Sequence, residues 1–342
     1  MAGTFQFGIA LRTQYPADSD ISEKFQDLLE LVRLADSLGY DSLTKTSHYS
    51  TAPYQAFQQF PLLARLSAEA PNIRLNAGII LLSLHKPLDL AEQLASIDIM
   101  CGGKLIVGAA LGYREVEFKA FGTTPRERAP RFEENLIALK RLWTENSVDM
   151  VGTHFELDGA TCLPKPLQKP HPPIWIGANA DPAIERAARV GDCWYIPPHN
   201  EVTTIIRQLE IYKRALDAAN KPFPEELPMR REVFVAPSRE EALRLCGPYL
   251  ADKYENYTEW GQSDQLPDDD SKLDQAFADL IGDRFLLGSP DEVVEQIIDL
   301  NRRIGTNHLI MSMDWPGMPK SATLDCLQLF AEEVAPQVRS GL

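Results

Sequence analysis

Eight short apolar segments alternate with helix-forming segments along this chain of 342 residues. The apolar segments are typical of strands covered on both faces, and they comprise residues 5–11, 41–46, 73–82, 104–110, 174–177, 193–196, 231–236 and 308–313. The helix-forming segments comprise residues 23–38, 60–69, 88–100, 126–143, 182–190, 202–219, 238–250, 290–303 and 324–334. Strands that alternate with helices form parallel sheets, and eight such strands close a barrel. The order therefore predicts an α/β fold, a (β/α)8 TIM barrel.

Two segments break this order, and we expect them to be insertions after strands 4 and 7. The first, at about residues 146–172, is rich in glycine and proline, which interrupt helices and strands. The second, at about residues 253–284, carries Tyr254, Tyr257 and Trp260 and an acidic run at 268–270 that is typical of a solvated loop. We expect it to act as a mobile lid over a substrate. No change of composition divides the chain, so residues 1–342 are predicted to form one domain.

The net charge of −15 argues against nucleic acid and anionic membranes as partners, because both would repel the protein. The five cysteines are scattered and form no CxxC pair, which favours a reducing compartment over a disulfide framework. Residues 1–14 are too short and too polar for a signal peptide, and no apolar stretch approaches the ~18 residues of a membrane span. We therefore expect a soluble cytoplasmic protein.

Residues 104–121, KLIVGAALGYREVEFKAF, are the strongest candidate for a ligand site. The pattern predicts a buried strand, a glycine-rich turn bracketed by Gly108 and Gly112, and the start of a charged helix. Parallel α/β folds keep their ligands at the carboxyl ends of strands, where such a turn presents backbone amides. A glycine-lined turn without a ligand is the alternative at this stage.

Several segments resemble the bacterial-luciferase-like family of flavin- or deazaflavin-dependent oxidoreductases, which are TIM barrels. The segments are residues 87–103 (PLDLAEQLASIDIMCGG), 105–122 (LIVGAALGYREVEFKAFG), 128–143 and 164–194 (PKPLQKPHPPIWIGANADPAIERAARVGDCW). They occur in the family's order through the first two-thirds of the chain. The resemblance implies that a phosphorylated isoalloxazine or deazaflavin lies across the carboxyl ends of the barrel strands.

The resemblance also implies which residues bind this cofactor. Gly177, Ala178 and Asn179 follow a strand and precede a helix, so their amides suit a phosphate in the field of the helix dipole. Ala178 replaces a glycine that the family usually has. Gly78 and Ile79 match a bulge, sometimes with a non-prolyl cis peptide, that lies against the ring. The other candidates are Gly112, Tyr113 as an aromatic contact, Arg114 for an anionic tail, and Trp194. A pair with Glu115 or Glu117 on the helix surface is the alternative for Arg114.

His48 matches the family's active-site histidine, whose imidazole can hydrogen-bond or move a proton near neutral pH. Many relatives have an acidic residue immediately before it, but this chain has Ser47, so that neighbour supplies no carboxylate. Residues at or just past other strand ends, together with one aromatic of the second insertion, are predicted to line a substrate pocket. They are Arg12, Tyr15, Trp260 and Trp315.

The function that the resemblance implies is that of a flavin-dependent monooxygenase acting on a small organic substrate with reduced FMN and O2. A separate flavin reductase would supply the reduced FMN, because the chain has no NAD-binding βαβ fingerprint. Hydride transfer with F420 is the alternative chemistry, and the residues do not separate the two. The resemblance further implies a homodimer. The identity of the substrate does not follow from the sequence.

Three other functions are weighed against this one. A metal-dependent hydrolase would favour HxH or HExxH, and the six histidines form neither, so no metal site is predicted. A Schiff-base enzyme needs a lysine at a strand end, for which Lys45 is a candidate without supporting neighbours. A non-catalytic flavin-binding protein is the third alternative, kept open by Ser47 and Ala178.

Overall fold

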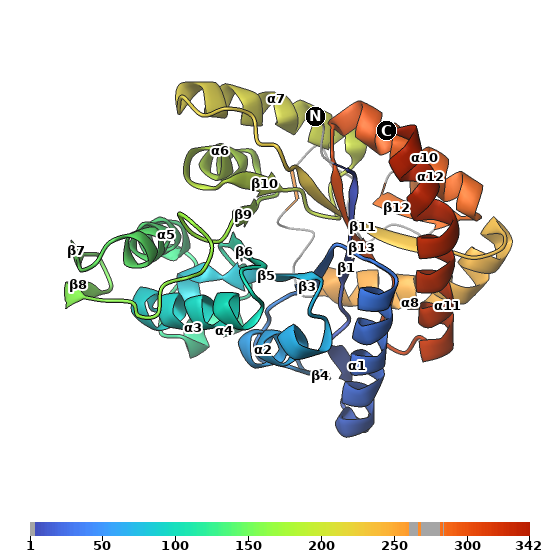
Figure 1. The fold of residues 1–342 in the computed structure, drawn as a ribbon, viewed down its shortest axis with the longest axis horizontal. Coiled ribbons are helices and arrows are strands. Elements are labelled where there is room, and N and C mark those ends of the chain that lie inside the picture. Colours follow the sequence, from blue (N-terminus) through green and yellow to red (C-terminus); the bar gives the residue numbers. More distant parts are fainter. Residues whose placement is uncertain (1–3, 260–265, 268–280, 283) are drawn as a thin grey trace.

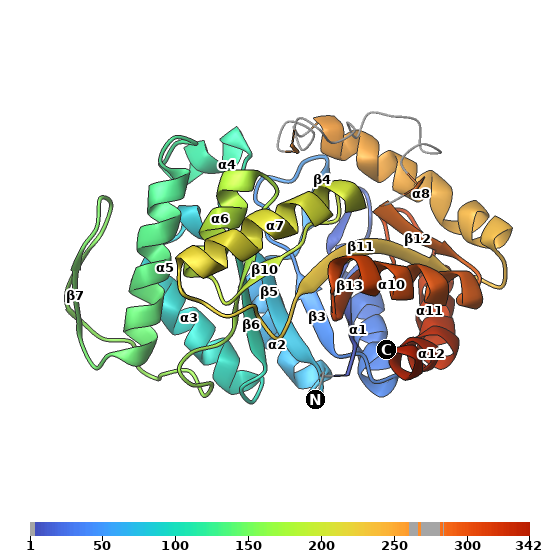
Figure 2. The same cartoon turned by 90° about the horizontal axis from the view of Figure 1, so that it is seen from above.

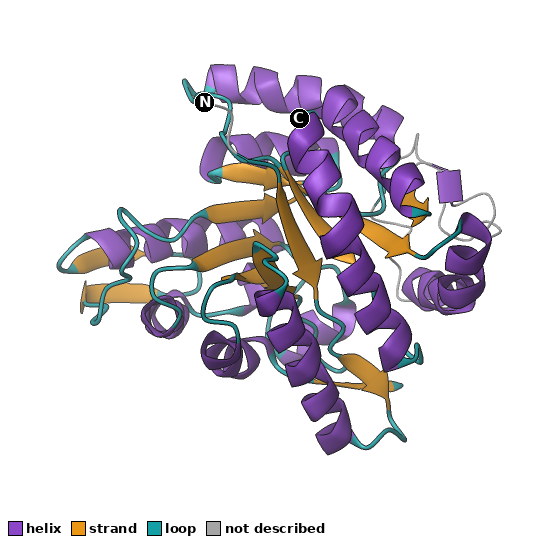
Figure 3. Ribbon diagram, turned by 45° about the vertical axis from the view of Figure 1, so that its right-hand side comes forward, coloured by secondary structure: helices purple, strands orange, loops and turns teal. Residues whose placement is uncertain are grey.

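A parallel sheet that curls on itself forms the centre of the molecule, and helices cover its outer side (Figures 1 and 3). The computed structural model describes residues 4–259, 266–267, 281–282 and 284–342. In spatial order the strands are β10 (Cys193–Tyr195), β9 (Ile174–Gly177), β6 (Leu105–Ala110), β5 (Arg74–Leu81), β3 (Ser42–Lys45), β1 (Gln6–Ala10), β13 (His308–Ser312), β11 (Pro228–Val235) and β12 (Phe285–Gly288). Every pairing in this sheet is parallel, which confirms the predicted α/β class.

The helices connect consecutive strands. They are α1 (Ile21–Ser37), α2 (Gln59–Glu69), η1 (Leu82–Leu84), α3 (Pro87–Met100), α4 (Glu115–Ala120), α5 (Arg128–Thr144), α6 (Asp181–Val190), α7 (Val202–Ala218), α8 (Arg239–Glu259), α10 (Pro290–Ile304), α11 (Lys320–Leu329), the π-helical turn η3 (Phe330–Val334) and α12 (Ala335–Gly341). None of the helices within the described ranges is long and apolar enough to pass through a membrane.

The ends of α10 show how strongly the local sequence can specify a helix. Ser289 and Glu292 form a capping box in which each side chain bonds the other residue's backbone amide. The helix ends at Gly305, whose φ of 82° is the left-handed conformation that glycine adopts most easily. These caps fix both ends of the helix that connects β12 to β13.

The strand order follows the chain order from β1 to β10 on one side of β1, while β13 and β11 lie on its other side. The curl brings β10 and β11 together through a parallel bridge between Ile196 and Met229. Two backbone hydrogen bonds make this contact, from the Ile196 amide to the Pro228 carbonyl and from the Arg230 amide to the Ile196 carbonyl, each 2.9 Å long. The carboxyl ends of the parallel strands consequently share one edge.

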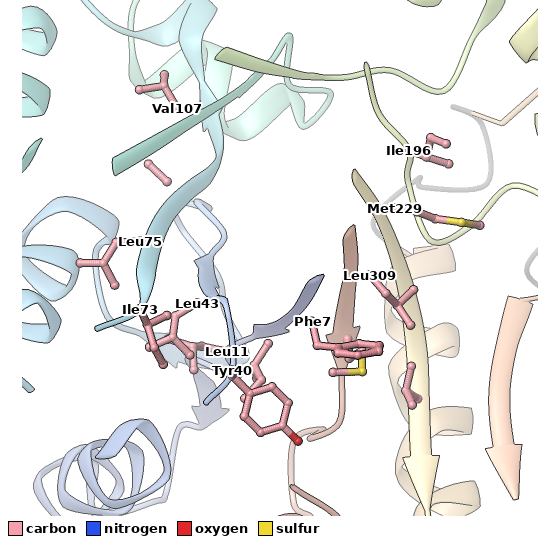
Figure 4. Close-up of a cluster of buried hydrophobic side chains, with 14 of the residues drawn as sticks. Phe7, Leu11, Tyr40, Leu43, Ile73, Leu75, Val107, Ile196, Met229 and Leu309 are labelled. Carbon is pink, nitrogen blue, oxygen red and sulfur yellow. The ribbon is translucent and has the colours of Figure 1, made fainter. Parts of the chain in front are cut away.

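Alternation along the strands separates two hydrophobic layers. Side chains such as Leu43, Leu75 and Leu309 belong to the large core between the sheet and the helices (Figure 4). Residues one position away, including Ile106 and Trp175, form a second, smaller cluster on the inner side of the curl. Each fully buried aliphatic side chain in such layers contributes about 1.5 to 3 kcal/mol to folding. Burial on both faces explains why the strands are continuously apolar in sequence.

Two small antiparallel hairpins lie outside the main sheet. One is not a hairpin in the strict sense but a pairing of β2 (Gln14–Pro16) with β4 (Tyr54–Ala56), which α1 and β3 separate in the chain. The other joins β7 (Val148–Val151) to β8 (Glu156–Ala160) within the segment predicted as the first insertion, and Figure 2 shows it extending beyond α5. Glycine and proline interrupt the periodic pattern of this segment, but the segment nevertheless contains two strands.

Three predictions about individual elements are corrected. Helix α8 continues to Glu259, so the start of the expected irregular region at residue 253 is helical. Strand β12 was not predicted, because four apolar residues beside an irregular segment give no periodic signal. Gly108 lies within β6 rather than at its turn. Most of the expected lid, including Trp260, lies outside the described residues, so the lid stays a prediction.

A half-buried ion pair closes the amino-terminal end of the sheet. Arg74 Nη1 lies 2.7 Å from Glu226 Oε1, which also lies 2.8 Å from His308 Nδ1. Burial lowers the pKa of His308, so its neutral ring donates from Nδ1 to Glu226 and accepts at Nε2 from the Ser42 hydroxyl, 2.8 Å away. Burial alone would raise the pKa of Glu226, but the hydrogen bonds from His308 and Arg74 lower it to about 2.

Replacing Glu226 with glutamine should lower the free energy of unfolding near neutral pH by about 1 to 3 kcal/mol, because a charged hydrogen-bond acceptor is lost. The folded-state pKa lies below the ordinary value of 4.5. The carboxylate's stabilising contribution is therefore complete above that ordinary value and is lost as the pH falls towards about 2. Urea denaturation of wild type and Glu226→Gln at about pH 7 and about pH 3 should show the difference shrinking. Glu295→Gln, at an exposed position on α10, is the control, and a pH-independent difference would contradict the assignment.

Candidate functional site

A cavity of about 240 Å³ opens at the carboxyl edge of the sheet. Its walls come from the carboxyl ends of β3, β5, β6, β9 and β10, from the segments that follow them, and from Arg230 near the start of β11. The structure brings eight of the predicted site residues to this cavity: His48, Gly78, Ile79, Gly112, Tyr113, Gly177, Ala178 and Asn179. Their assigned roles in binding and catalysis stay predictions, but their convergence makes the cavity the candidate site.

The wall formed by β5 and β6 depends on two glycines. The Gly78–Ile79 peptide is cis, and the register between the two strands shifts around it. A Cβ atom on Gly78 would lie 2.4 Å from the Asn76 amide nitrogen, and one on Gly108 would lie 2.7 Å from the Gly78 Cα. The two backbones are thus too close for any other residue, and the bulge presents Ile79 to the cavity.

Hydrogen bonds from two side chains to backbone carbonyls stabilise the turn between β9 and α6. Trp194 Nε1 donates to the Ala178 carbonyl at 3.0 Å, and Gln208 Nε2 donates to the Asn179 carbonyl at 2.7 Å. Trp194 is completely buried and does not line the cavity, so it supports the turn instead of contacting a ligand. The N-cap of α6, Ala180, offers no side-chain acceptor. Pro182 has no N–H and the Ala183 amide donates to the Ala180 carbonyl at 2.9 Å, so within the described residues the Asp181 amide is the first-turn donor left for an anion.

Arg128, which the sequence did not single out, adds a positive charge to this side of the cavity. It is the first residue of α5, and its Nη1 donates to the Gly112 carbonyl at 3.1 Å. Burial and the neighbouring Arg186 lower its pKa. No carboxylate of the described residues forms an ion pair with it, so its charge is available to a ligand. The only sequence signal was its place at the start of a predicted helix.

His48 is paired with a buried carboxylate, although not from its sequence neighbour. Glu117 on α4 is 1% exposed, and its Oε1 lies 3.2 Å from His48 Nδ1. The same oxygen accepts from the Tyr49 amide at 2.9 Å. An acceptor-only carboxylate at Nδ1 favours the tautomer in which that nitrogen carries the proton. The carboxylate that Ser47 could not supply comes from a helix nearly seventy residues away in sequence.

Arg114 supports the His48 segment and does not line the cavity. Its guanidinium donates to the Tyr49 carbonyl at 2.8 Å and to the Ser50 carbonyl at 3.1 Å, and it lies 3.5 Å from Glu117. The pair between Arg114 and Glu117, which was the alternative to a cofactor contact, is therefore present. Tyr113 does line the cavity, and its ring lies edge-on to that of His48 with centroids 6.2 Å apart.

A smaller cavity of about 50 Å³ adjoins the first through Thr46, Arg230 and Lys253, which line both. It contains two of the predicted substrate-pocket residues, Arg12 and Trp315. Arg12 Nε pairs with Asp314 at 2.9 Å, and burial raises the pKa of Asp314 to about 6.

The other predicted substrate residues lie elsewhere. Tyr15 is buried, and its hydroxyl donates to the Arg12 carbonyl at 3.2 Å, so it packs beneath the smaller cavity without lining it. Trp260 lies outside the described residues.

Arg230, Lys253 and His199 also line the larger cavity and were missed. Arg230 was missed because β11 begins at Pro228, three residues before the predicted strand, and Lys253 because α8 is longer than predicted. Burial places the pKa of His199 well below its ordinary value, and the charges of Lys253 and Arg230 lower it further. For Arg230, the only available signal in the sequence was the presence of a basic residue at the start of a strand.

The residues that a metal-dependent hydrolase or a Schiff-base enzyme would need are not grouped at the cavity in the described part of the chain. Within the described ranges, no three histidine, cysteine or acidic side chains are close enough together to hold a metal ion. Lys45 does not line the cavity; its ammonium donates to the Thr46 carbonyl, and burial lowers its pKa to about 7.

The sequence profile of the luciferase-like monooxygenases matches residues 5–308. This match spans most of the chain, and the chain therefore belongs to that family.

Individual relatives agree with this assignment. The FMNH(2)-dependent dimethylsulfone monooxygenase of Pseudomonas putida is 34% identical over 197 residues, which are 56% of this chain and 53% of that protein, so the match spans about half the relative's length. The oxygenase component of the flavin-dependent trigonelline monooxygenase of Acinetobacter baylyi is 25% identical over 241 residues, 69% of this chain and 67% of that protein. Among solved structures, the monooxygenase RslO1 of Streptomyces bottropensis superposes with a TM-score of 0.86 at 28% identity, covering 97% of this chain and 99% of that one.

Replacing Glu117 with glutamine should weaken the preference of His48 for the Nδ1-protonated tautomer, because an amide presents a donor as well as an acceptor. Loss of the charged acceptor for the Tyr49 amide should also cost about 1.5 to 3 kcal/mol of stability. Nitrogen-15 spectra of the imidazole ring and urea denaturation measure the two effects. Glu115→Gln, at an exposed position on the same helix, is the matched control. An unchanged tautomer in Glu117→Gln would refute the assignment.

Proposed function

We propose that this protein is a monooxygenase that uses reduced FMN and O2 to oxygenate a small organic substrate. One observation carries the proposal: the cavity at the carboxyl edge of the sheet combines a helix start without a side-chain cap, an arginine that has no carboxylate partner among the described residues, and a histidine backed by a buried carboxylate. Family membership and the names of its relatives, which include an FMNH(2)-dependent enzyme, support the choice of flavin.

The residues present fit a phosphorylated flavin. Gly177 leaves the β9 turn open, since a Cβ there would lie 3.2 Å from Ile79 Cγ2, and Arg128 supplies the charge that a phosphate requires. Ile79, Ala110 and Leu111 give an apolar wall suited to a flat ring. The cofactor-binding set would thus be Gly78, Ile79, Gly112, Tyr113, Gly177, Ala178 and Asn179, with Arg128 added. Arg114 and Trp194 would act through the backbone that they hold.

Reduced FMN supplies the electrons that activate O2, and the protein must position the reactants, exclude water and supply a proton. With Nδ1 bonded to Glu117, His48 would exchange a proton with a ligand in the cavity through its Nε2 atom. Arg114 and Glu117 together fix the segment that carries this ring. We assign His48 as the catalytic residue and Glu117 as its positioning residue.

The finer features of architecture and assembly belong to the same proposal. We infer that the curled sheet is a (β/α)8 barrel whose eight strands are the predicted ones, with β12 outside the ring and insertions after strands 4 and 7. The bridge between β10 and β11 supports this closure. The oxygenase component among the relatives supports a separate flavin reductase as partner. We also infer a homodimer in the cytoplasm, which sedimentation and cell fractionation would test.

Hydride transfer with F420 is the competing function, and it would use the same phosphate site. The sharpest test is titration with FMN and F420, oxidised and reduced, of wild type, Gly177→Asp and Gly177→Ala. Aspartate should weaken FMN binding about a hundredfold or more, because it places a negative charge at the phosphate. Alanine, which only requires Ile79 to move slightly, should keep most of the affinity. A preference for F420 would favour hydride transfer, and binding of neither cofactor would overturn the proposal.

A second prediction isolates the phosphate. Arg128→Met should weaken FMN binding about tenfold or more, since a charge-assisted contact is lost. Riboflavin, which lacks the phosphate, should bind the variant and the wild type with equal affinity. Arg302→Met, at an exposed position on α10, is the control. Equal losses for FMN and riboflavin would show that Arg128 does not contact the phosphate.

A further inference from the structure

The charge of the larger cavity is opposite to that of the chain. The protein carries a net charge of −15, yet no aspartate or glutamate is among the described residues that line this cavity. Three basic residues do line it: Arg128, Arg230 and Lys253. They come from separate elements, because Arg128 begins α5 beyond β6, whereas Arg230 lies in β11 and Lys253 in α8. A flavin phosphate bound at Arg128 would account for only one of these three basic residues.

Arg230 is held so that one edge of its guanidinium stays open. Its Nε donates to the Ser312 hydroxyl on the neighbouring strand β13 at 3.0 Å. No hydrogen bond or ion pair to its terminal nitrogens is found in the part of the chain that the structure describes. These two nitrogens form the fork that binds a carboxylate or sulfonate through two parallel hydrogen bonds. Ser312 therefore fixes the orientation of an arginine whose binding edge has no protein acceptor.

The other charges around Arg230 are compensated. Lys253 pairs with Glu232, which is completely buried and also accepts from Trp315 Nε1 at 2.8 Å. Arg12 pairs with Asp314 in the adjoining smaller cavity. His199, which lines the same wall, is held neutral by burial. Among the residues that the structure describes, Arg230 is thus the positive charge at the junction of the two cavities that no acidic side chain compensates.

We propose that Arg230 binds the anionic group of the organic substrate, a carboxylate or a sulfonate, at the junction of the two cavities. The substrate class is therefore an organic acid whose apolar part extends into the larger cavity towards Ile79. This inference rests on the proposed flavin site, because the flavin phosphate must occupy the Arg128 side for Arg230 to be left to the substrate. Bidentate recognition explains why an arginine held at Nε stands there in preference to a lysine.

The test uses the full-length protein saturated with FMN. Hexanoate, hexane-1-sulfonate and the uncharged hexanamide are titrated into wild type, Arg230→Met, Arg230→Lys and Arg302→Met, following the visible spectrum of the bound flavin. In wild type and in the Arg302→Met control, at least one acid should bind about tenfold or more tightly than the amide. Arg230→Met should abolish this preference with FMN affinity unchanged. Arg230→Lys, which keeps the charge and the fold but loses the fork, should retain only part of it.

Three results would overturn the inference. One is equal binding of both acids and the amide by wild type. Another is an Arg230→Met variant that keeps the preference, and the third is one that loses FMN affinity as strongly as Arg128→Met, which would place the flavin phosphate at Arg230. Failure of the proposed function is seen separately, as wild type that binds no FMN. The acids are then titrated into the flavin-free protein by tryptophan fluorescence, and an Arg230-dependent preference there would support an organic-acid site without a flavin.

Discussion

Parallel hydrogen bonding between neighbouring strands is the constraint on which the site depends. Because all strands of the sheet run in the same direction, the segments that follow them meet at one edge. His48 and Gly112 are far apart in the sequence, yet they line one cavity for this reason, and Arg230 lines the same cavity from within β11. The contact between Ile196, which follows β10, and the start of β11 is a small part of this bonding, but it joins the two sides of the curled sheet. Together with the ladder that runs from β11 through β13 and β1 to β9, it sets the position of Arg230 relative to the rest of the cavity.

Buried and half-buried charges in this protein fall into two groups that differ in their partners. Glu117, Glu226, Glu232 and Asp314 each contact a basic side chain or a histidine, which offsets the cost of removing a carboxylate from water. Arg128 and Arg230 have no such acid among the described residues, and both line the cavity. A desolvated cation without a protein counter-ion is unfavourable unless water or a ligand balances it. The contrast separates residues that stabilise the fold from those suited to bind ligands.

The part of the site that sequence reasoning recovered consists of residues adjacent to strand ends. Gly78, Gly112, Gly177 and His48 could be placed because glycine patterns and strand boundaries are local signals. Glu117 was recognised only as a possible surface partner of Arg114, since the contact with His48 joins two segments that no local pattern relates. Arg230 escaped because the strand was predicted to begin one residue later, and strand boundaries are the least reliable part of such predictions.

The sequence by itself determined the class of fold, the order of the strands and the edge of the sheet where a ligand would bind. These follow from apolar periodicity, helix caps such as Ser289 and glycine positions, which act over a few residues. The tertiary structure alone decided which carboxylate supports His48, and that Trp194 and Arg114 hold backbone and do not line the cavity. It also decided that Arg128 and Arg230 face the cavity without acids beside them. The physical reason is that pairing of charges in space depends on how distant segments pack, and this information is not contained in the spacing of residues along the chain.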